Sequence, residues 1–227
     1  YRAMNGRSGQ RNGQGVSGQI VTSDLVHWSW YQVYGMLTPG SWIAMSANKY
    51  MNKYGVTAED LGRVAISQRN YAVTNPRAFG YQKPLTMEDY LASKMIASPL
   101  RLYDFCQESD GGCALLITSA ERAVGLKQKP AVIRGITQAS TQGQEQMTSF
   151  YRNELSTLPE MELAAKRVCA QSGLQASDID AACLYDAFTS EVVMQLESFG
   201  FCGSGEAKDF IKEGGLDIDG RLPNNTH

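Results

Sequence analysis

The chain has 227 residues, of which 43% are hydrophobic, and its charged side chains nearly cancel to a net charge of −2. This length and composition allow a sizeable core in one or two domains and are typical of an ordinary globular protein. The near-neutral charge and the lack of a dense Lys/Arg cluster argue against a nucleic-acid-binding face, and no run approaches the roughly 20 apolar residues that a membrane span needs.

The cysteines indicate neither a metal site nor a disulfide framework, because they form no Cys-x-x-Cys pair and follow no regular spacing. A reducing, cytoplasmic location fits this usage best. The five cysteines are Cys106, Cys113, Cys169, Cys183 and Cys202.

The first part of the chain is predicted to be a loop followed by helices. Residues 1–30 are rich in Gly, Gln, Ser and Arg and lack apolar periodicity, which is typical of a loop. Thr57 and Thr86 each precede acidic residues, as N-caps do, while Pro76 and Pro99 each stop a helix. Three helices are therefore predicted, at residues 41–52, 57–73 and 86–97.

The second part alternates predicted strands and helices, which favours an α/β fold. The strands are predicted at residues 114–118, 131–136 and 179–184. The helices are predicted at residues 119–123, 160–172 and 190–199. Gly173 and Gly200 end the last two helices, and Thr189 or Ser190 is expected to cap the last one.

Tyr185 and Asp186 stand where the third predicted strand gives way to the last predicted helix. In open α/β sheets, ligands usually bind at the carboxyl ends of the strands, where side chains and helix amino termini converge. A phenol with an ordinary pKa near 10 donates a hydrogen bond to an oxyanion, or takes a proton from a hydroxyl if that pKa is lowered. Position alone therefore makes Tyr185 a candidate site residue.

Several short motifs recur in family order along nearly the whole chain. Tyr185–Phe188, followed by Asn225–His227, resembles the thiolase superfamily, in which Asn-Glu-Ala-Phe or His-Asp-Cys-Phe precedes Asn-x-x-Gly-Gly. Asp110–Ala114 is similar to the Asp-Gly-Ala-Ala-Ala segment of thiolases. Segments that recur in the sterol-carrier and lipid-transfer branch are Tyr1–Gly9, Tyr50–Gly55, Asn75–Ala78 and Pro99–Asp104.

The resemblance implies a fold and a domain organisation. The fold is the thiolase-like five-layer αβαβα arrangement, an α/β fold, and we expect this chain to be a fragment that lacks both ends. Residues 1–138 would be the remainder of the N-terminal thiolase half with its helical insertion. Residues 139–227 would be the start of the C-terminal half.

The resemblance also implies an activity. Tyr185 stands where degradative thiolases carry Asn or His, and this departure resembles the thiolase-like steroid side-chain aldolases. Their chemistry is a retro-aldol cleavage of a steroid or similar β-hydroxyacyl-CoA, which releases a ketone and a short acyl-CoA. A base removes the β-hydroxyl proton, and hydrogen-bond donors stabilise the enolate that forms on the thioester. Coenzyme A enters as part of the substrate, and the chain is expected to bind no cofactor or metal of its own.

By the same resemblance, Tyr185 and His227 are predicted to be catalytic and Asn225 and Asp186 to bind substrate. Tyr185 could instead pack and satisfy its hydroxyl, Asn225 could fix the turn, and Asp186 could cap or orient. None of the five cysteines matches a catalytic thiolase motif, so each is expected to be a small buried apolar residue.

Two other functions stay open, an acetyl-CoA acyltransferase (thiolase) and a non-catalytic lipid-transfer or acyl-CoA-binding protein. A nucleophilic cysteine upstream would favour the first, and acyl-CoA binding without turnover the second. The resemblance further implies a homodimer and, as in the aldolase branch, a separate OB-fold, zinc-containing partner subunit. No nucleic acid is expected as a partner.

Overall fold

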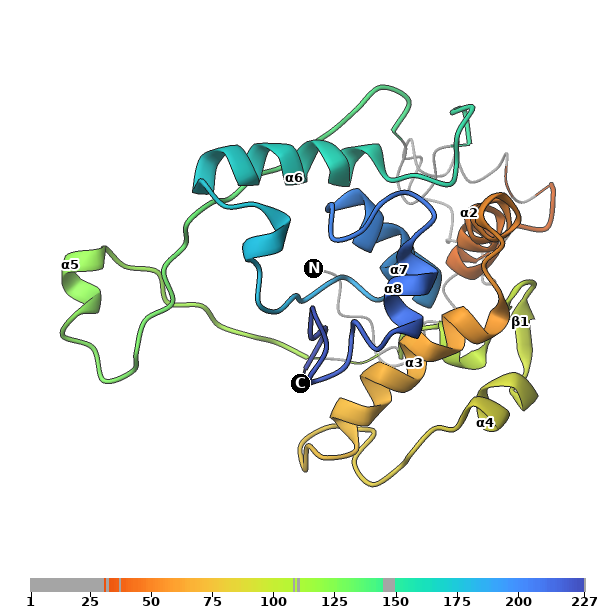
Figure 1. The fold of residues 1–227 in the computed structure, drawn as a ribbon, viewed down its shortest axis with the longest axis horizontal. Helices are drawn as coiled ribbons and strands as arrows, with labels where there is room; N and C mark the ends of the chain where they lie inside the picture. Colours follow the sequence, from red (N-terminus) through yellow and green to blue (C-terminus); the bar gives the residue numbers. More distant parts are fainter. Residues whose placement is uncertain are drawn as a thin grey trace, which may run out of the picture.

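The computed structural model describes residues 31, 33–36, 38–107, 109, 111–144 and 150–226. Helices dominate this part of the chain (Figure 1). In chain order the elements are α2 (Pro39–Tyr54), α3 (Ala58–Ala72), α4 (Met87–Ala92), β1 (Met95–Ala97), β2 (Leu100–Arg101), the 3-10 turn η2 (Leu102–Asp104), α5 (Ala120–Ala123), α6 (Pro159–Ser172), the 3-10 turn η3 (Ala176–Asp178), α7 (Thr189–Ser198) and α8 (Ala207–Lys212).

Helices α2 and α3 form where the sequence predicts the first two helices. Pro39 occupies the first turn of α2, where its missing N–H has no intrahelical partner to lose, and Gly55 ends the helix with a φ of +66°. At the start of α3 the Asp60 amide donates to the Thr57 hydroxyl, and the Thr57 amide donates to the Asp60 carboxylate. This capping box is a purely local signal, which explains why sequence predicts it.

Helix α4 begins where it is predicted but ends sooner. Thr86 and Asp89 form a second capping box at its start. The prediction of helix as far as Ala97 is wrong, because Ser93 is already extended and β1 then pairs antiparallel with β2. Backbone groups that bond to a neighbouring strand cannot also bond within a helix.

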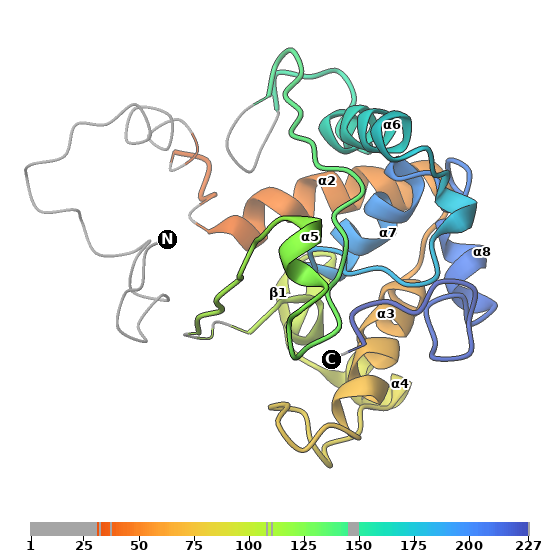
Figure 2. The same ribbon diagram turned by 90° about the vertical axis from the view of Figure 1, so that its left-hand side faces the viewer.

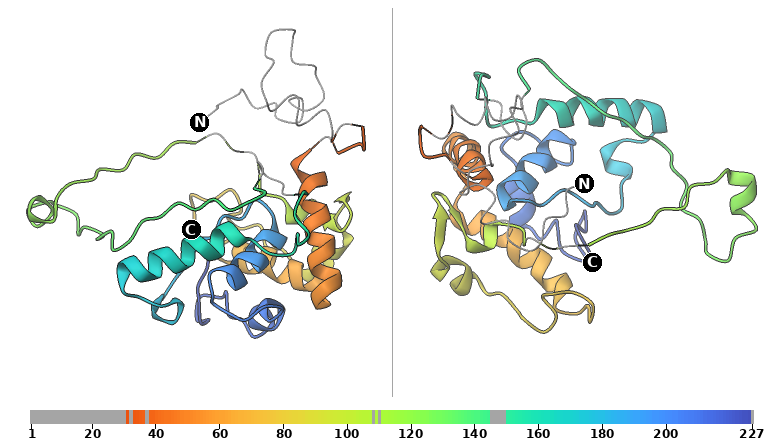
Figure 3. Two further views of the ribbon diagram at one scale, coloured as in Figure 1. Left: turned by 90° about the horizontal axis from the view of Figure 1, so that it is seen from above. Right: turned by 180° about the vertical axis from the view of Figure 1, so that it is seen from behind.

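The predictions of strands at residues 114–118 and 131–136 are wrong for this structure. Both lie in residues 111–138, here called the arm, which run out from the helices and back, with α5 at the far end (Figures 1 and 3). A strand is stabilised by hydrogen bonds to a neighbour, and within the described part of the chain no segment pairs with either. Leu116 and Val132 are consequently 86% and 76% exposed.

Helix α7 is the centre of the described core. It packs against α3, α6 and α8, and Figure 2 shows α6 on one side of it and α3 on the other. Val192, Val193 and Leu196 are fully buried. Full burial of three such side chains contributes about 5 kcal/mol or more of transfer free energy, so this helix is a main source of the stability of the core.

The ends of the later helices follow the predictions in part. Helix α6 forms as predicted, and Gly173 ends it with a φ of +73°. The predicted cap of α7 is wrong, because its N-cap residue is Phe188, which has no side-chain acceptor. The hydroxyl of Thr189 donates to Asp104 instead, a residue far away in sequence. Helix α8 was not predicted.

Candidate functional site

Tyr185 lies in the extended segment 181–186, directly before α7. Along this segment the odd-numbered residues are exposed, whereas the even-numbered ones are buried or half-buried. This is the alternation expected of extended chain, in which successive side chains point to opposite faces. Tyr185 is 72% exposed, and Asp186 belongs to the inner face. The structure thus places these two predicted site residues on opposite sides of one segment.

Two asparagines hold this segment along one edge. The third predicted strand is reduced to one parallel bridge between Ala182 and Asn224, in which the Asn225 amide donates to the Ala182 carbonyl at 3.0 Å. Beyond the bridge the side chains continue the pairing. The Leu184 amide donates to Asn224 Oδ1 at 3.3 Å, and Asn225 Nδ2 donates to the Leu184 carbonyl at 3.0 Å.

Asn225 is therefore placed as a backbone anchor. It is 5% exposed and has a left-handed φ of +52°, a conformation that asparagine tolerates better than most residues. This geometry corresponds to the turn-fixing alternative for Asn225. Contact of Asn225 with substrate stays a prediction.

A glutamine of α7 holds the next residue. The amide of Tyr185 donates to Gln195 Oε1 at 3.2 Å, and Gln195 Nε2 donates to the carbonyl of Tyr185. Gln195 is 2% exposed. Sequence reasoning missed Gln195, because a single polar residue on an amphipathic helix is normally read as solvent-facing.

Asp186 lines a cavity of about 490 Å³ between α3, the loop that follows it and residues 102–107. Its walls include the aromatic rings of Phe79, Tyr103 and Phe105, and the Arg69 guanidinium lies 5.8 Å from the centre of the Tyr103 ring. The walls combine these rings with polar side chains, among them Gln68 and Gln107, which suits a ligand that has both apolar and polar parts. Tyr185 does not line this cavity.

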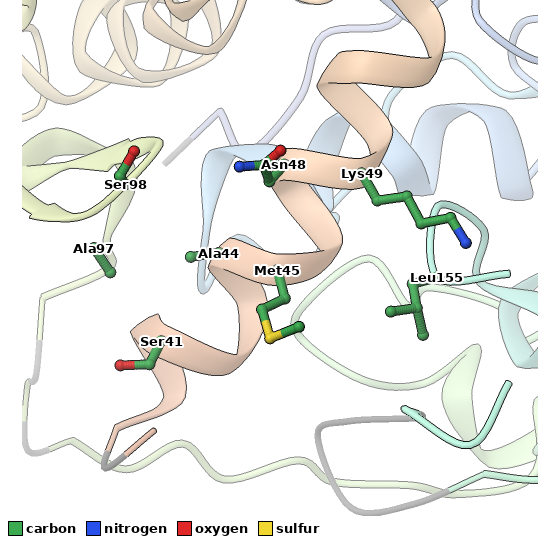
Figure 4. Close-up of a pocket in the computed structure, with 8 residues that line it drawn as sticks. All are labelled: Ser41, Ala44, Met45, Asn48, Lys49, Ala97, Ser98 and Leu155. Atoms are coloured by element: carbon green, nitrogen blue, oxygen red, sulfur yellow. The ribbon is translucent and has the colours of Figure 1, made fainter. Parts of the chain in front are cut away.

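A second cavity, of about 520 Å³, lies on the outer face of α2 (Figure 4). Met45 and Lys49 extend along it from α2, and Leu155 closes it on one side. It contains none of the predicted site residues.

Helix α7 is also joined to α4 and β2 through a buried carboxylate, Asp104. Asp104 is 1% exposed and accepts hydrogen bonds from the hydroxyls of Tyr90 and Thr189 and from the Arg101 amide. Burial raises the pKa of Asp104, although the hydrogen bonds from Thr189, the Arg101 amide and Tyr90 lower it. Sequence reasoning missed this cluster because its members come from distant segments.

Glu191, in the first turn of α7, is a largely buried ionisable group. Its Oε2 atom is buried and accepts no hydrogen bond from the described residues. Burial raises the pKa of Glu191 to about 7, since the charged form loses hydration.

The remaining predictions concern His227, the cysteines, metals and membranes. His227 lies outside the described residues, so its catalytic role stays a prediction. The expectation of five buried cysteines is wrong, because Cys106, Cys113 and Cys183 are exposed. Among the described residues, no three His, Cys, Asp or Glu side chains gather where they could hold a metal ion, and no helix could span a membrane.

Comparison with known proteins finds similarity to the same family that the motifs resemble. The family model described as "Thiolase C-terminal domain-like" matches residues 141–227. The whole chain aligns at 52% identity with a protein of Thermomonospora curvata named "Steroid side-chain-cleaving aldolase". It aligns at 48% identity with the "17-hydroxy-3-oxo-4-pregnene-20-carboxyl-CoA lyase" of Mycobacterium tuberculosis. The chain spans 59% of the length of each of these two relatives.

A solved structure shows the fold. The "Ltp2-ChsH2(DUF35) aldolase" superposes with a TM-score of 0.89 at 52% identity, over 94% of this chain and 55% of that one. The predicted thiolase-like fold is thereby confirmed, although within the described residues the only sheet is the pair β1 and β2. In sequence and in fold the chain is therefore similar to thiolase-like proteins.

Proposed function

We propose that this chain belongs to a carbon–carbon lyase that cleaves a steroid or similar β-hydroxyacyl-CoA thioester in a retro-aldol reaction. One observation carries the proposal. Tyr185 is an exposed phenol on a segment whose backbone is hydrogen-bonded by Asn225 and Gln195, and by the resemblance it stands where degradative thiolases carry Asn or His. The similarity to two proteins named as a steroid aldolase and a CoA-ester lyase supports the substrate class.

The reaction assigns Tyr185 a proton-transfer role. Removal of the β-hydroxyl proton lets the oxygen form a carbonyl while the Cα–Cβ bond breaks, and its electron pair passes to the thioester as an enolate. Protonation of the enolate carbon then gives the shortened acyl-CoA, and the hydroxyl carbon leaves as a ketone. Tyr185 acts as acid or base in these transfers, and His227 supplies the second group.

The substrate and partners follow from the same proposal. Coenzyme A is bound only as part of the substrate, and Asp186 and Asn225 contact or orient that substrate. The complete protein forms a homodimer and works with an OB-fold, zinc-containing subunit. The similar solved structure carries a DUF35 component in its name, which supports such a partner.

The test is an assay of the complete protein, with and without its partner subunit, on a steroid β-hydroxyacyl-CoA. We expect release of a ketone and a short acyl-CoA, and a loss of at least about 100-fold in kcat for Tyr185→Phe. Tyr151→Phe is the matched control, because Tyr151 is 79% exposed and remote in sequence from the site. It should keep normal activity.

Other outcomes would replace the proposal. Full activity of Tyr185→Phe would remove Tyr185 from proton transfer. Acyl transfer from a 3-ketoacyl-CoA to free CoA, without lyase activity, would identify a thiolase. Binding of acyl-CoA with neither reaction would identify a lipid carrier.

A further inference from the structure

We propose that Gln195 is a positioning residue that orients the phenol of Tyr185 from the buried core. This inference rests on the proposed role of Tyr185. It starts from the two hydrogen bonds that join the Gln195 amide to the amide and the carbonyl of Tyr185. A third bond runs from Gln195 Nε2 to the Glu191 carbonyl at 3.1 Å, so both N–H groups of the amide are engaged.

The position of Tyr185 explains why a side chain is needed there. Parallel pairing with residues 223–225 holds the chain only as far as Leu184, through Asn224 and Asn225. Tyr185 is the next residue, and its backbone amide and carbonyl both bond to the side chain of Gln195. A primary amide offers one acceptor and a donor side by side, as the backbone of a neighbouring strand does. Gln195 therefore bonds to the Tyr185 backbone in the way that a neighbouring strand bonds to its partner.

The anchor is rigid because of where Gln195 stands. It is 2% exposed and lies in α7 next to the fully buried Leu196, in the helix that contacts α3, α6 and α8 (Figure 2). Hydrogen bonds from such a position fix the Tyr185 backbone relative to the packed core rather than relative to a surface loop. Since the backbone sets the direction of the Cα–Cβ bond, it also sets where the phenol can reach.

Such positioning matters for catalysis in a measurable way. Displacement of a reacting group by about 1 Å can cost on the order of 100-fold in rate, even when the changed residue never touches substrate. Groups built on helices hold geometry better than groups on loops. We expect the loss to appear in kcat rather than in the binding of the CoA ester.

The test variant is Gln195→Met in the complete protein with its partner, since methionine keeps the length and removes all three hydrogen bonds. We expect kcat to fall about 10- to 100-fold while KM changes less than about threefold. Gln171→Met is the matched control. Gln171 also accepts a hydrogen bond from a backbone amide, that of Ile136, at 2.7 Å. It lies on α6 and makes this bond to the arm rather than to Tyr185. Its kcat should be unchanged.

A double-mutant cycle separates positioning from simple stabilisation. If Gln195 acts through the phenol, Gln195→Met has no further effect on the residual kcat of Tyr185→Phe. Circular dichroism at the assay temperature establishes that each variant is folded.

Three results would overturn the inference. A normal kcat in folded Gln195→Met, with Tyr185→Phe inactive, removes the positioning role but leaves the proposed function standing. An equal loss from Gln195→Met in the presence and absence of the phenol shows a structural effect only. Full activity of Tyr185→Phe ends the proposed function of Tyr185 and this inference with it.

Discussion

Helices α2 to α4 and α6 to α8, here called the body, contain the same kinds of apolar side chain as the arm. The two regions differ in how far those side chains are buried. In the body, Leu61 of α3 and Leu196 of α7 are fully buried. In the arm, residues 111–138, Leu115 and Leu116 are both 86% exposed. The difference teaches that an apolar run finds a structure only where a second surface is present to cover it, because burial requires a partner.

The two regions also treat polar groups differently. In the body, Asp104 gathers hydrogen bonds from three residues of different segments. In the arm, Glu121 is fully exposed, and a hydrogen bond from the nearby Ser119 lowers its pKa. Three predictions test how far this contrast extends.

The largest expected effect compares a leucine from each region. Leu196→Ala should lower the free energy of unfolding of the 227-residue chain by about 3 kcal/mol, because it opens a cavity in a fully packed core. Leu116→Ala should change it by less than about 0.5 kcal/mol, since almost nothing covers that side chain. Urea unfolding followed by circular dichroism measures both. Equal losses would break the comparison and would show that the arm is covered in solution.

The second prediction compares a carboxylate from each region. Asp104→Asn should cost about 2 to 3 kcal/mol, because the amide accepts fewer of the buried donors from Tyr90, Thr189 and the Arg101 backbone. Glu121→Gln in the arm is the control and should stay within about 0.5 kcal/mol. Tyr90→Phe should then cost less in the Asp104→Asn background than in the natural chain. A full, unchanged cost of Tyr90→Phe would contradict the proposed network.

The third prediction concerns the pH dependence of stability. The pKa of Glu191 is about 7 in the folded chain, above the ordinary value of 4.5 expected when unfolded, so the folded state binds more protons between those two values. Stability should therefore fall as pH rises from about 5 to about 8, by roughly 1 to 3 kcal/mol from this group. Glu191→Gln should flatten that slope. Free energies of unfolding, measured at about pH 5 and about pH 8 for the natural chain and for Glu191→Gln, test this prediction. The same pH dependence in both would show that other groups cause it.

The sequence predicted local features well and non-local ones poorly. The caps at Thr57 and Thr86 and the stop at Gly173 need only a few neighbouring residues, and all three formed. The predicted cap of α7 was wrong because the Thr189 hydroxyl donates to Asp104, a residue far away in sequence. Helix α8 is only six residues long and has no side-chain cap, so its sequence carries little signal.

The candidate site divides in the same way. Tyr185 could be singled out from its place before a helix and from its motif, and the structure leaves it exposed there. Asn225 could be named from the motif, but its bonds to the Leu184 carbonyl and the Ala182 carbonyl depend on a distant segment. Gln195 gave no signal, because its function as an anchor exists only after α7 packs against the segment before it.

Sequence by itself therefore determined several helix starts and stops, the resemblance to the thiolase superfamily and the candidate phenol, because these depend on neighbouring residues and on short motifs. The tertiary structure alone decided which apolar runs are buried, where Asp186 faces, and which groups hold Tyr185. Those outcomes depend on contacts between segments far apart in the chain. A strand-forming sequence such as residues 114–118 specifies how its own chain extends, but only a neighbouring segment can complete its hydrogen bonds.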